Sequence, residues 1–477
     1  MKYRIGPSGL IFDIVTLNYK VLYIKKYMIQ DEPHKHGIMD GLKESVTVKL
    51  LFIATLILVL LIPSSLVNNL IDERASRQDE MMRDVSDKWS GSQVIKGPVL
   101  IIPYKQQIKE TDATNKEIMR EHTGNLCLLP DNLHIKAGLT TQILHRGIFD
   151  VAVYNSLVKV SGNFSKADLS SLSLTPDQLL LNKARIVFSI TDLKGLKNNP
   201  VIKANEQSLT AEPVFDNSSI FGGGLQVAVD ISNAKDGNVP FEYALDLKGS
   251  QGLSFLHLGK TTDVEADGSW SSPSFDGRYL PDDRTVNKSG FKARWRMLYY
   301  NRPFPQQWVD NDRLLSSDKK LADAIFGVKL RLPVDQYQKT MRTSKYALLI
   351  IALTFISLFL TEVIRKQRIH IFNYILIGIA MIIYYSLLLS FSEQVGYNYA
   401  YLIASVSTIV LVSVFIASLL KNKMAAWLFA FILSVFYAFI FVIIQLEDFA
   451  LIIGSIALFI VVAILMYFSR KINWEKH

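Results

Sequence analysis

Long runs of apolar residues occur at two places in the chain, separated by residues 72–342, where no run is long enough to cross a bilayer. The first is LLFIATLILVLLIPSSLV at 50–67. The others, about 20 residues each, have the length that a helix needs to cross roughly 30 Å of hydrocarbon. They occupy 346–364, 371–391, 399–420, 424–446 and 449–468. The pattern predicts a membrane protein with six transmembrane α-helices, one before and five after a large insert.

A helical period continues beyond the first apolar run. Between 67 and 89, apolar residues recur at spacings of three, four and seven among acidic and basic ones. They are Val67, Ile71, Ala75, Met82, Val85 and Trp89. A secretory signal peptide is the alternative, because the purely apolar part at 50–62 is short. The nearly fifty preceding residues favour an uncleaved anchor at 49–71 whose helix runs on into the insert.

The insert at 72–342 is rich in alternating apolar and polar residues, the pattern of half-buried β-strands. Clusters of Gly, Pro, Asn, Asp and Ser, such as FGGG, separate these pieces. We expect a large antiparallel β-rich domain, sandwich-like, with one short helix within 316–327. The predicted strands lie within 98–108, 184–193, 224–231, 241–249, 291–300 and 326–334.

Composition and charge agree with a chain that combines membrane spans with a water-soluble domain. Hydrophobic residues make up 49% of the chain while 20% are charged, and the mean hydropathy is +0.21. Most of the formal net charge of +9 lies in residues 1–49 and 342–477, which flank the apolar runs. This distribution indicates membrane topology and excludes a phosphate-binding face for nucleic acid. Cys127 is the single cysteine, so an intramolecular disulfide and a thiolate metal cluster are both excluded.

The joints between the last five runs alternate in charge. Residues 365–370, 421–423 and the tail 469–477 are basic, whereas 392–398 and 447–448 are acidic. Lys and Arg in short loops mark the cytoplasmic side of a membrane. The alternation therefore predicts a cytoplasmic N-terminus, a periplasmic β-rich domain and a cytoplasmic C-terminus.

Two carboxylates near these helices need separate interpretations. Glu393 falls in the predicted external hairpin, where we expect a solvated turn residue; the alternative is that it folds back toward the outer domain or a partner. Glu362 lies about one turn from the end of its span, where Arg365 and Lys366 are within pairing distance along the helix. The spans otherwise carry no ionisable groups at mid-depth, which disfavours a coupled transporter.

Candidate chemistry is sparse. No zinc-protease, nucleophile-elbow or phosphate-loop motif occurs, so no catalytic residue, metal site or cofactor is predicted. The richest aromatic and basic stretch is RWRMLYYNRP at 294–303, in which Arg294 and Arg296 alternate with Trp295. A strand with one buried face explains this alternation. A binding face for an anionic glycan or a lipid headgroup is the alternative.

Several linked segments resemble the CreD family of bacterial inner-membrane proteins. They are KGPVLIIP (96–103), WSSPSFDGRYLP (270–281), SGFKARW (289–295), the entry to the second span (333–362), QRIH (367–370), SEQVGY (392–397) and LIAS (402–405). The resemblance covers residues 43–475. It implies one anchor, a periplasmic domain, a helical bundle and a role in cell-envelope integrity, without established catalytic residues or ligand. Positions that match the family's motifs are Gln367, Arg368, His370, Glu393, Gly396 and Trp270.

We therefore predict a non-enzymatic, multi-pass inner-membrane protein that contributes to envelope integrity. Its domains would be a cytoplasmic tail at 1–48, or upstream sequence with the true start at Met39, then 49–71, 72–342, 345–468 and 469–477. Besides the lipid bilayer, the expected partner is a protein, glycan or lipid of the periplasmic side. One alternative is a carrier or flippase for a lipid-like amphipathic molecule, and another is a membrane-tethered hydrolase.

Overall fold

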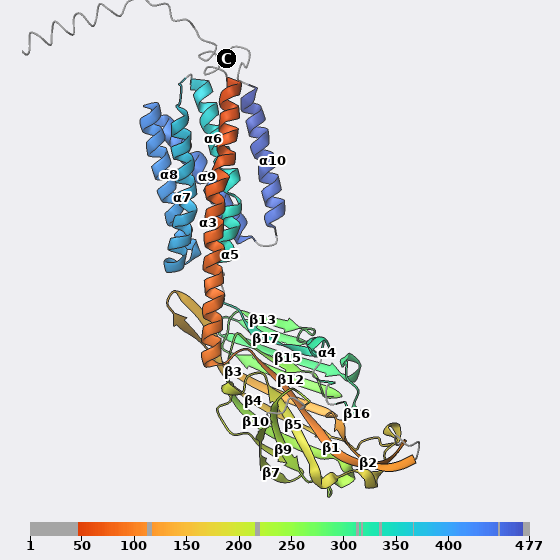
Figure 1. Cartoon of the computed structure of the whole chain (residues 1–477). Coiled ribbons are helices and arrows are strands. Elements are labelled where there is room, and N and C mark those ends of the chain that lie inside the picture. The colour runs from red at the N-terminus through yellow and green to blue at the C-terminus, as the bar shows by residue number, and fades with distance from the viewer. Residues whose placement is uncertain are drawn as a thin grey trace, which may run out of the picture. The chain divides into compact units, whose positions relative to one another are not determined.

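The computed structural model describes residues 46–111, 117–214, 220–311, 314–315, 318–332, 336–365, 367–446 and 449–470. It divides into two compact units, each considered by itself (Figure 1). The helical unit comprises the described residues up to Ser65, Lys345–Tyr384 and those from Ser405 onward. The β-rich unit comprises Leu66–Ser344 and Tyr385–Ala404. The predicted N-terminal tail falls almost wholly outside the described residues, as do Lys366, residues 447–448 and the final residues of the chain.

Long apolar helices form where the hydrophobic runs predict them. They are α3 (Val46–Trp89), α6 (Ala347–Arg365), α7 (Ile371–Val395), α8 (Tyr397–Leu420), α9 (Lys423–Gln445) and α10 (Ala450–Ser469). A short polar helix, α5 (Gln336–Lys345), directly precedes α6. Within the described parts of the chain, five stretches are long and apolar enough to cross a membrane, the second of them combining α5 with α6. The last predicted span is helical over the 20 residues of α10, although it is not among the five stretches. Five spans are thus supported, and the sixth stays a prediction.

The β-rich unit contains two sheets. The nine-stranded sheet consists of β1 (Gln93–Thr111), β2 (Glu117–Leu128), β5 (Ala184–Ile190), β8 (Glu212–Val214), β9 (Gly224–Val229), β11 (Gly252–Leu256), β13 (Pro273–Gly277), β16 (Gln307–Val309) and β17 (Ile325–Leu330). The eight-stranded sheet has the order β14-β15-β12-β3-β4-β10-β6-β7. Its strands are β3 (Asn132–Arg146), β4 (Phe149–Phe164), β6 (Val201–Ala204), β7 (Gln207–Thr210), β10 (Val239–Ser250), β12 (Thr261–Gly268), β14 (Asp283–Asn287) and β15 (Gly290–Leu298).

One hydrophobic core joins the two sheets. A single buried cluster draws on strands of both, and aromatic rings meet across it. Phe188 of β5 lies 4.6 Å from Tyr243 of β10, centroid to centroid. Trp295 of β15 lies 5.6 Å from Phe326 of β17. The layers visible in Figure 1 are therefore a packed sandwich, as predicted.

The prediction of purely antiparallel sheets is wrong in two places. Strand β1 pairs with β11 in parallel, and β3 pairs with β12 in parallel. More than one hundred residues separate each of these pairs along the chain, so no hairpin dictates their direction. Apolar alternation reports which face of a strand is buried and carries no information on the direction of its neighbour.

The second half of α3 packs within the β-rich unit on its predicted apolar face. Val85 forms a small buried cluster with Val151 and Val153 of β4. Ser86 Oγ lies 2.7 Å from Ser250 Oγ, and the ammonium of Lys248 lies 5.2 Å from the Trp89 ring centroid. The helical period read beyond the first apolar run is confirmed.

A buried histidine makes the stability of this unit depend on pH. His257 follows β11, has no exposed surface, and its Nδ1 lies 3.0 Å from Thr262 Oγ1 while Nε2 lies 3.3 Å from the Leu298 carbonyl oxygen. A neutral ring satisfies both contacts, with Nε2–H donating to the carbonyl and Nδ1 accepting from the hydroxyl. Burial, opposed by the Leu298 carbonyl and assisted by the nearby Arg302 charge, lowers the pKa of His257 to about 4.

We expect protonation to oppose folding as the pH falls. An unfolded histidine has a pKa near 6.5, so this group's contribution is complete above that value and is lost progressively between about 6.5 and 4. The full loss is about 3 kcal/mol. Urea titrations of the full-length protein in detergent, followed by tryptophan fluorescence between pH 7 and 5, measure it. The free energy of unfolding should depend less steeply on pH in His257→Gln. An unchanged dependence would show that His257 does not titrate in this range.

Candidate functional site

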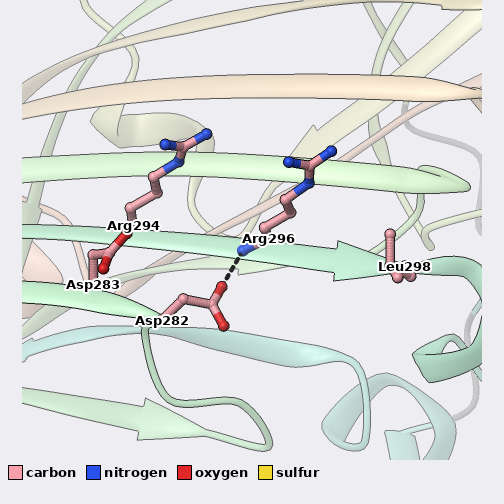
Figure 2. A pocket seen from close by; sticks show the side chains of 5 residues that line it. All are labelled: Asp282, Asp283, Arg294, Arg296 and Leu298. Carbon is pink, nitrogen blue, oxygen red and sulfur yellow. Dashed lines mark hydrogen bonds between the residues drawn. The ribbon is translucent and has the colours of Figure 1, made fainter.

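The outer face of β15 carries the arginine pair predicted from sequence. Arg294 and Arg296 are exposed, whereas Trp295 and Met297 point into the core, so the half-buried strand interpretation is confirmed. A cavity of about 450 Å³ opens beside the pair. Its lining residues, which we call the arginine pocket, are Asp282, Asp283, Arg294, Arg296 and Leu298. In Figure 2 both guanidinium groups extend in the same direction from the strand.

A neighbouring carboxylate lies beside the two arginines. Asp263 stands opposite Arg296 in the β12–β15 register, and its Oδ1 lies 3.8 Å from Arg294 Nη2 and 3.8 Å from Arg296 Nε. The Asp263 side chain is only 17% exposed, whereas those of Arg294 and Arg296 are 50% and 63% exposed. Both distances exceed the length of a hydrogen bond, and Asp263 Oδ1 has no hydrogen-bond partner among the described residues, so one shared anion attracts two cations without a hydrogen bond to either.

The pocket also contains two carboxylates, Asp282 just before β14 and Asp283 at its first position. Asp282 Oδ2 accepts the backbone N–H of Arg296 at 2.7 Å, and Asp283 lies opposite Arg294 in the β14–β15 register. Arginine offers a planar fork of donors that suits carboxylate and phosphate, while carboxylates accept hydrogen bonds from hydroxyl groups. The arrangement is suited to binding a polar ligand of mixed character. Within the described residues, no cluster of three or more His, Cys, Asp or Glu could hold a metal.

Trp270 has a different position from the arginines. Its side chain is in the buried core of the sandwich, and Nε1 donates to the Arg331 carbonyl at 3.0 Å. Trp270, which matches the family motif, therefore packs in the core and hydrogen-bonds to the backbone just after the end of β17.

Glu362 is the centre of a polar cluster in the helical unit. Lys49 of α3 pairs with its Oε1, the N–H of Ile369 donates to the same oxygen at 3.1 Å, and Tyr374 Oη of α7 donates to Oε2 at 3.0 Å. The Lys49 ammonium also donates to the Ile369 carbonyl at 2.8 Å. The carboxylate side chain is 10% exposed. The expected pairing with Arg365 or Lys366 is wrong for the first, whose place Lys49 takes, while the second lies outside the described residues.

The QRIH segment forms the short connection around that cluster. The N–H of Gln367 donates to the Glu362 carbonyl at 3.2 Å and ends α6, and His370 Nδ1 accepts from the Phe372 N–H at 3.2 Å, which caps the start of α7. Between them Arg368 is exposed, and Ile369 is buried. The motif places the backbone N–H and C=O of Ile369 against Glu362 and Lys49.

Glu393 is held within the β-rich unit. Its side chain is 11% exposed, accepts a hydrogen bond from Tyr337 Oη of α5 at 2.9 Å, and lies 3.9 Å from Arg74 Nε of α3. The expectation of a solvated turn residue is therefore wrong. The turn itself is as tight as predicted, because Gly396 alone separates α7 from α8 and adopts a φ of +79°. That left-handed backbone favours glycine.

Sequence reasoning missed the partners that complete these sites: Lys49, Asp263 and Tyr337. Only Lys49 had a readable signal. It is a cation at the start of an apolar run in a chain whose spans carry one carboxylate, and opposite charges in lipid usually pair. Asp263 and Tyr337 sit in ordinary polar surroundings, and the fold alone brings them to the arginines and to Glu393.

Comparisons with known proteins agree with this architecture. A family model described as inner membrane protein CreD matches residues 45–475. The protein named "Inner membrane protein CreD" of Escherichia coli (strain K12) is 29% identical over 423 residues, which covers 88% of this chain and 91% of that protein. Together with the five membrane-crossing stretches, these matches identify a multi-pass protein of the inner membrane and confirm the resemblance seen in the sequence. The chain belongs to the CreD family of inner membrane proteins.

Proposed function

We propose that this protein is a non-enzymatic receptor or scaffold of the cell envelope, whose β-rich unit lies in the periplasm and binds an envelope component through the arginine pocket. The observation that carries the proposal is the pair of exposed guanidinium groups side by side on one strand, beside one nearly buried carboxylate. Guanidinium groups offer a planar fork of donors that suits carboxylate and phosphate groups. The contribution to envelope integrity follows from the family resemblance.

The periplasmic placement rests on charge. The α6–α7 and α8–α9 connections carry Arg and Lys, whereas Glu393 lies in the last turn of α7, just before the connection to α8. Positive residues in short loops stay on the cytoplasmic side, which assigns the first two connections to the cytoplasm. The β-rich insert follows the first span and so falls on the opposite side, with both termini cytoplasmic.

The cluster around Glu362 supports an anchoring role for the helices over a carrier role. Carriers of ions and charged solutes keep ionisable groups available along a pathway. Here Lys49, Tyr374 and the Ile369 backbone together occupy both carboxylate oxygens. Glu362 thereby links α6 to α3 and α7 through an ion pair and hydrogen bonds.

The test is the material that co-purifies with the full-length protein in mild detergent. Mass spectrometry of its protein, lipid and carbohydrate content should reveal a component that falls at least tenfold in Arg294→Ala/Arg296→Ala. Because both side chains are at least half exposed, the double variant should fold normally. Lys292→Ala is the matched control, since Lys292 is exposed on the same strand but does not line the pocket.

Two outcomes would contradict the proposed function. The double variant could retain everything that the unmodified protein retains, or Lys292→Ala could lose the same component to the same extent. The first outcome would show that the pocket does not bind the component. The second would show that the arginines act only through the general charge of the surface.

A further inference from the structure

We infer that the end of the α7–α8 hairpin, residues 392–398, is held by the β-rich unit and folds and unfolds with it. At this hairpin end, α7 and α8 are thereby coupled to the β-rich unit. Two polar contacts, one on each side of Gly396, carry the inference, and neither involves the arginine pocket. The proposed function can therefore fail while this coupling holds, and the reverse.

The first contact holds the α7 side of the turn. Glu393 accepts a hydrogen bond from Tyr337 Oη of α5 at 2.9 Å, and its carboxylate lies 3.9 Å from Arg74 Nε of α3. The Glu393 side chain is 11% exposed. A partly buried pair of charges is screened less than a pair on the open surface. One carboxylate of α7 thus hydrogen-bonds to α5 and attracts a cation of α3.

The second contact holds the α8 side of the turn. Tyr397 Oη lies 2.7 Å from Thr343 Oγ1 of α5, and both residues are almost fully buried. Thr343 donates its own hydroxyl proton to the Lys339 carbonyl at 2.8 Å, so Tyr397 is the donor in this pair. The Lys339 ammonium lies 5.8 Å from the Tyr397 ring centroid, which adds a cation–π attraction. Separation of α8 from α5 would leave a buried hydroxyl without its partner, at a cost in free energy.

The backbone of the turn joins both contacts to the helices. The Gly396 N–H donates to the Ser392 carbonyl, and the Ala400 N–H donates to the Gly396 carbonyl, at 3.1 Å each. Helical hydrogen bonds thus reach the glycine from both sides. Tyr385–Ala404 belong to the β-rich unit, whereas the rest of α7 and α8 belongs to the helical unit. Each of the two helices is therefore shared by both units, and its hairpin end follows the β-rich unit.

Thiol labelling of the full-length protein in detergent, at increasing urea concentration, tests this coupling. Cys127 is buried in β2 and reports the opening of the β-rich unit. Ser392→Cys places a second thiol at the hairpin end, where Ser392 has no exposed surface. Peptide mass spectrometry reads the two thiols separately. We expect both to become reactive over the same range of urea concentration, and Trp295→Ala to shift both to lower concentrations together.

Loss of the α5 contacts should separate the two reporters. In Tyr337→Phe/Thr343→Val the side chains keep their shape but no longer hydrogen-bond to Glu393 and Tyr397. Without urea, the thiol at position 392 should then react at least tenfold faster, while the urea transition of Cys127 stays in place. Tyr279→Phe is the matched control, because Tyr279 Oη donates to the Asn301 carbonyl at 2.6 Å elsewhere in the β-rich unit. Any shift that it causes should be equal for both reporters.

Three results would overturn the inference. If the thiol at position 392 reacts rapidly without urea while the α5 contacts are intact, the hairpin end is not held. If it stays protected after Cys127 has become reactive, the helical unit holds the hairpin end instead. Unchanged labelling in Tyr337→Phe/Thr343→Val would show that the contacts with α5 do not hold it.

Discussion

Replacing Lys49 by methionine is expected to destabilise the helical unit by about 3–5 kcal/mol, the usual cost of breaking a buried ion pair from one side. The change removes the cation from a carboxylate that is 10% exposed, and among the described residues Tyr374 and the Ile369 N–H remain as its partners. Glu362→Gln keeps one acceptor oxygen, for the Ile369 N–H, replaces the oxygen that accepts from Tyr374 by an amide NH2, and leaves the Lys49 ammonium without its counter-charge. It should therefore also destabilise the unit.

The double variant Lys49→Met/Glu362→Gln tests whether the two side chains stabilise the unit through their interaction or independently of each other. It removes both charges and keeps the acceptor, so we expect it to be more stable than either single variant. Apparent melting temperatures of the full-length proteins in detergent measure the cycle. The exposed pair of Arg77 with Glu73 is the matched control, and Glu73→Gln should cost only a few tenths of a kcal/mol. Additive losses at Lys49 and Glu362 would mean that the two side chains do not interact.

Trp295→Ala should destabilise the β-rich unit by about 3–5 kcal/mol, the range for truncation of a large buried aromatic. Trp295 is 1% exposed, and its ring packs against Phe326 at 5.6 Å and edge-on against Phe275 at 5.9 Å. Its Nε1 also donates to the Tyr279 carbonyl at 3.2 Å. Because Trp295 packs between strands of the two sheets, its truncation should weaken the core that holds the two sheets together as one domain.

Hydrogen exchange of the full-length protein, read by mass spectrometry in peptides from β12 and β17, measures this loss. Both sheets should lose protection together in Trp295→Ala. Tyr300→Ala removes an aromatic of similar size that is 92% exposed, and its protection should match the unmodified protein. Unchanged protection in Trp295→Ala would mean that the inter-sheet core does not depend on this ring.

The predicted elements follow from patterns that are local in the chain. All six strand segments expected from alternation coincide with strands, and the short helix appears as α4 (Asp318–Ala322). The hairpin of β3 and β4 was missed, although the buried residues Leu133, Ile135, Ala137 and Leu139 alternate with exposed residues along β3. By contrast, β14 is exposed at every residue, so no apolar period marks this edge strand.

The features that were missed are contacts between distant residues. Lys49 reaches Glu362 across 313 positions of the chain, and Asp263 reaches the arginines from another strand. Periodicity shows which face of an element is buried but does not show which other elements pack beside it. Arg294 and Arg296 could thus be placed on an outer face from the sequence, while the carboxylate near them and the pocket beside them required the fold.

The central claim is that the arginine pocket contacts an envelope component in the living cell, and photo-cross-linking from position 298 tests it most directly. Leu298 lines the pocket, and Leu157 of β4 is similarly exposed, at 50% against 47%, elsewhere on the eight-stranded sheet. With a photoreactive amino acid at either position, we predict an adduct to envelope material from 298 that Arg294→Ala/Arg296→Ala removes, and none from 157. Equal adducts from both positions, or none from 298, would contradict the account.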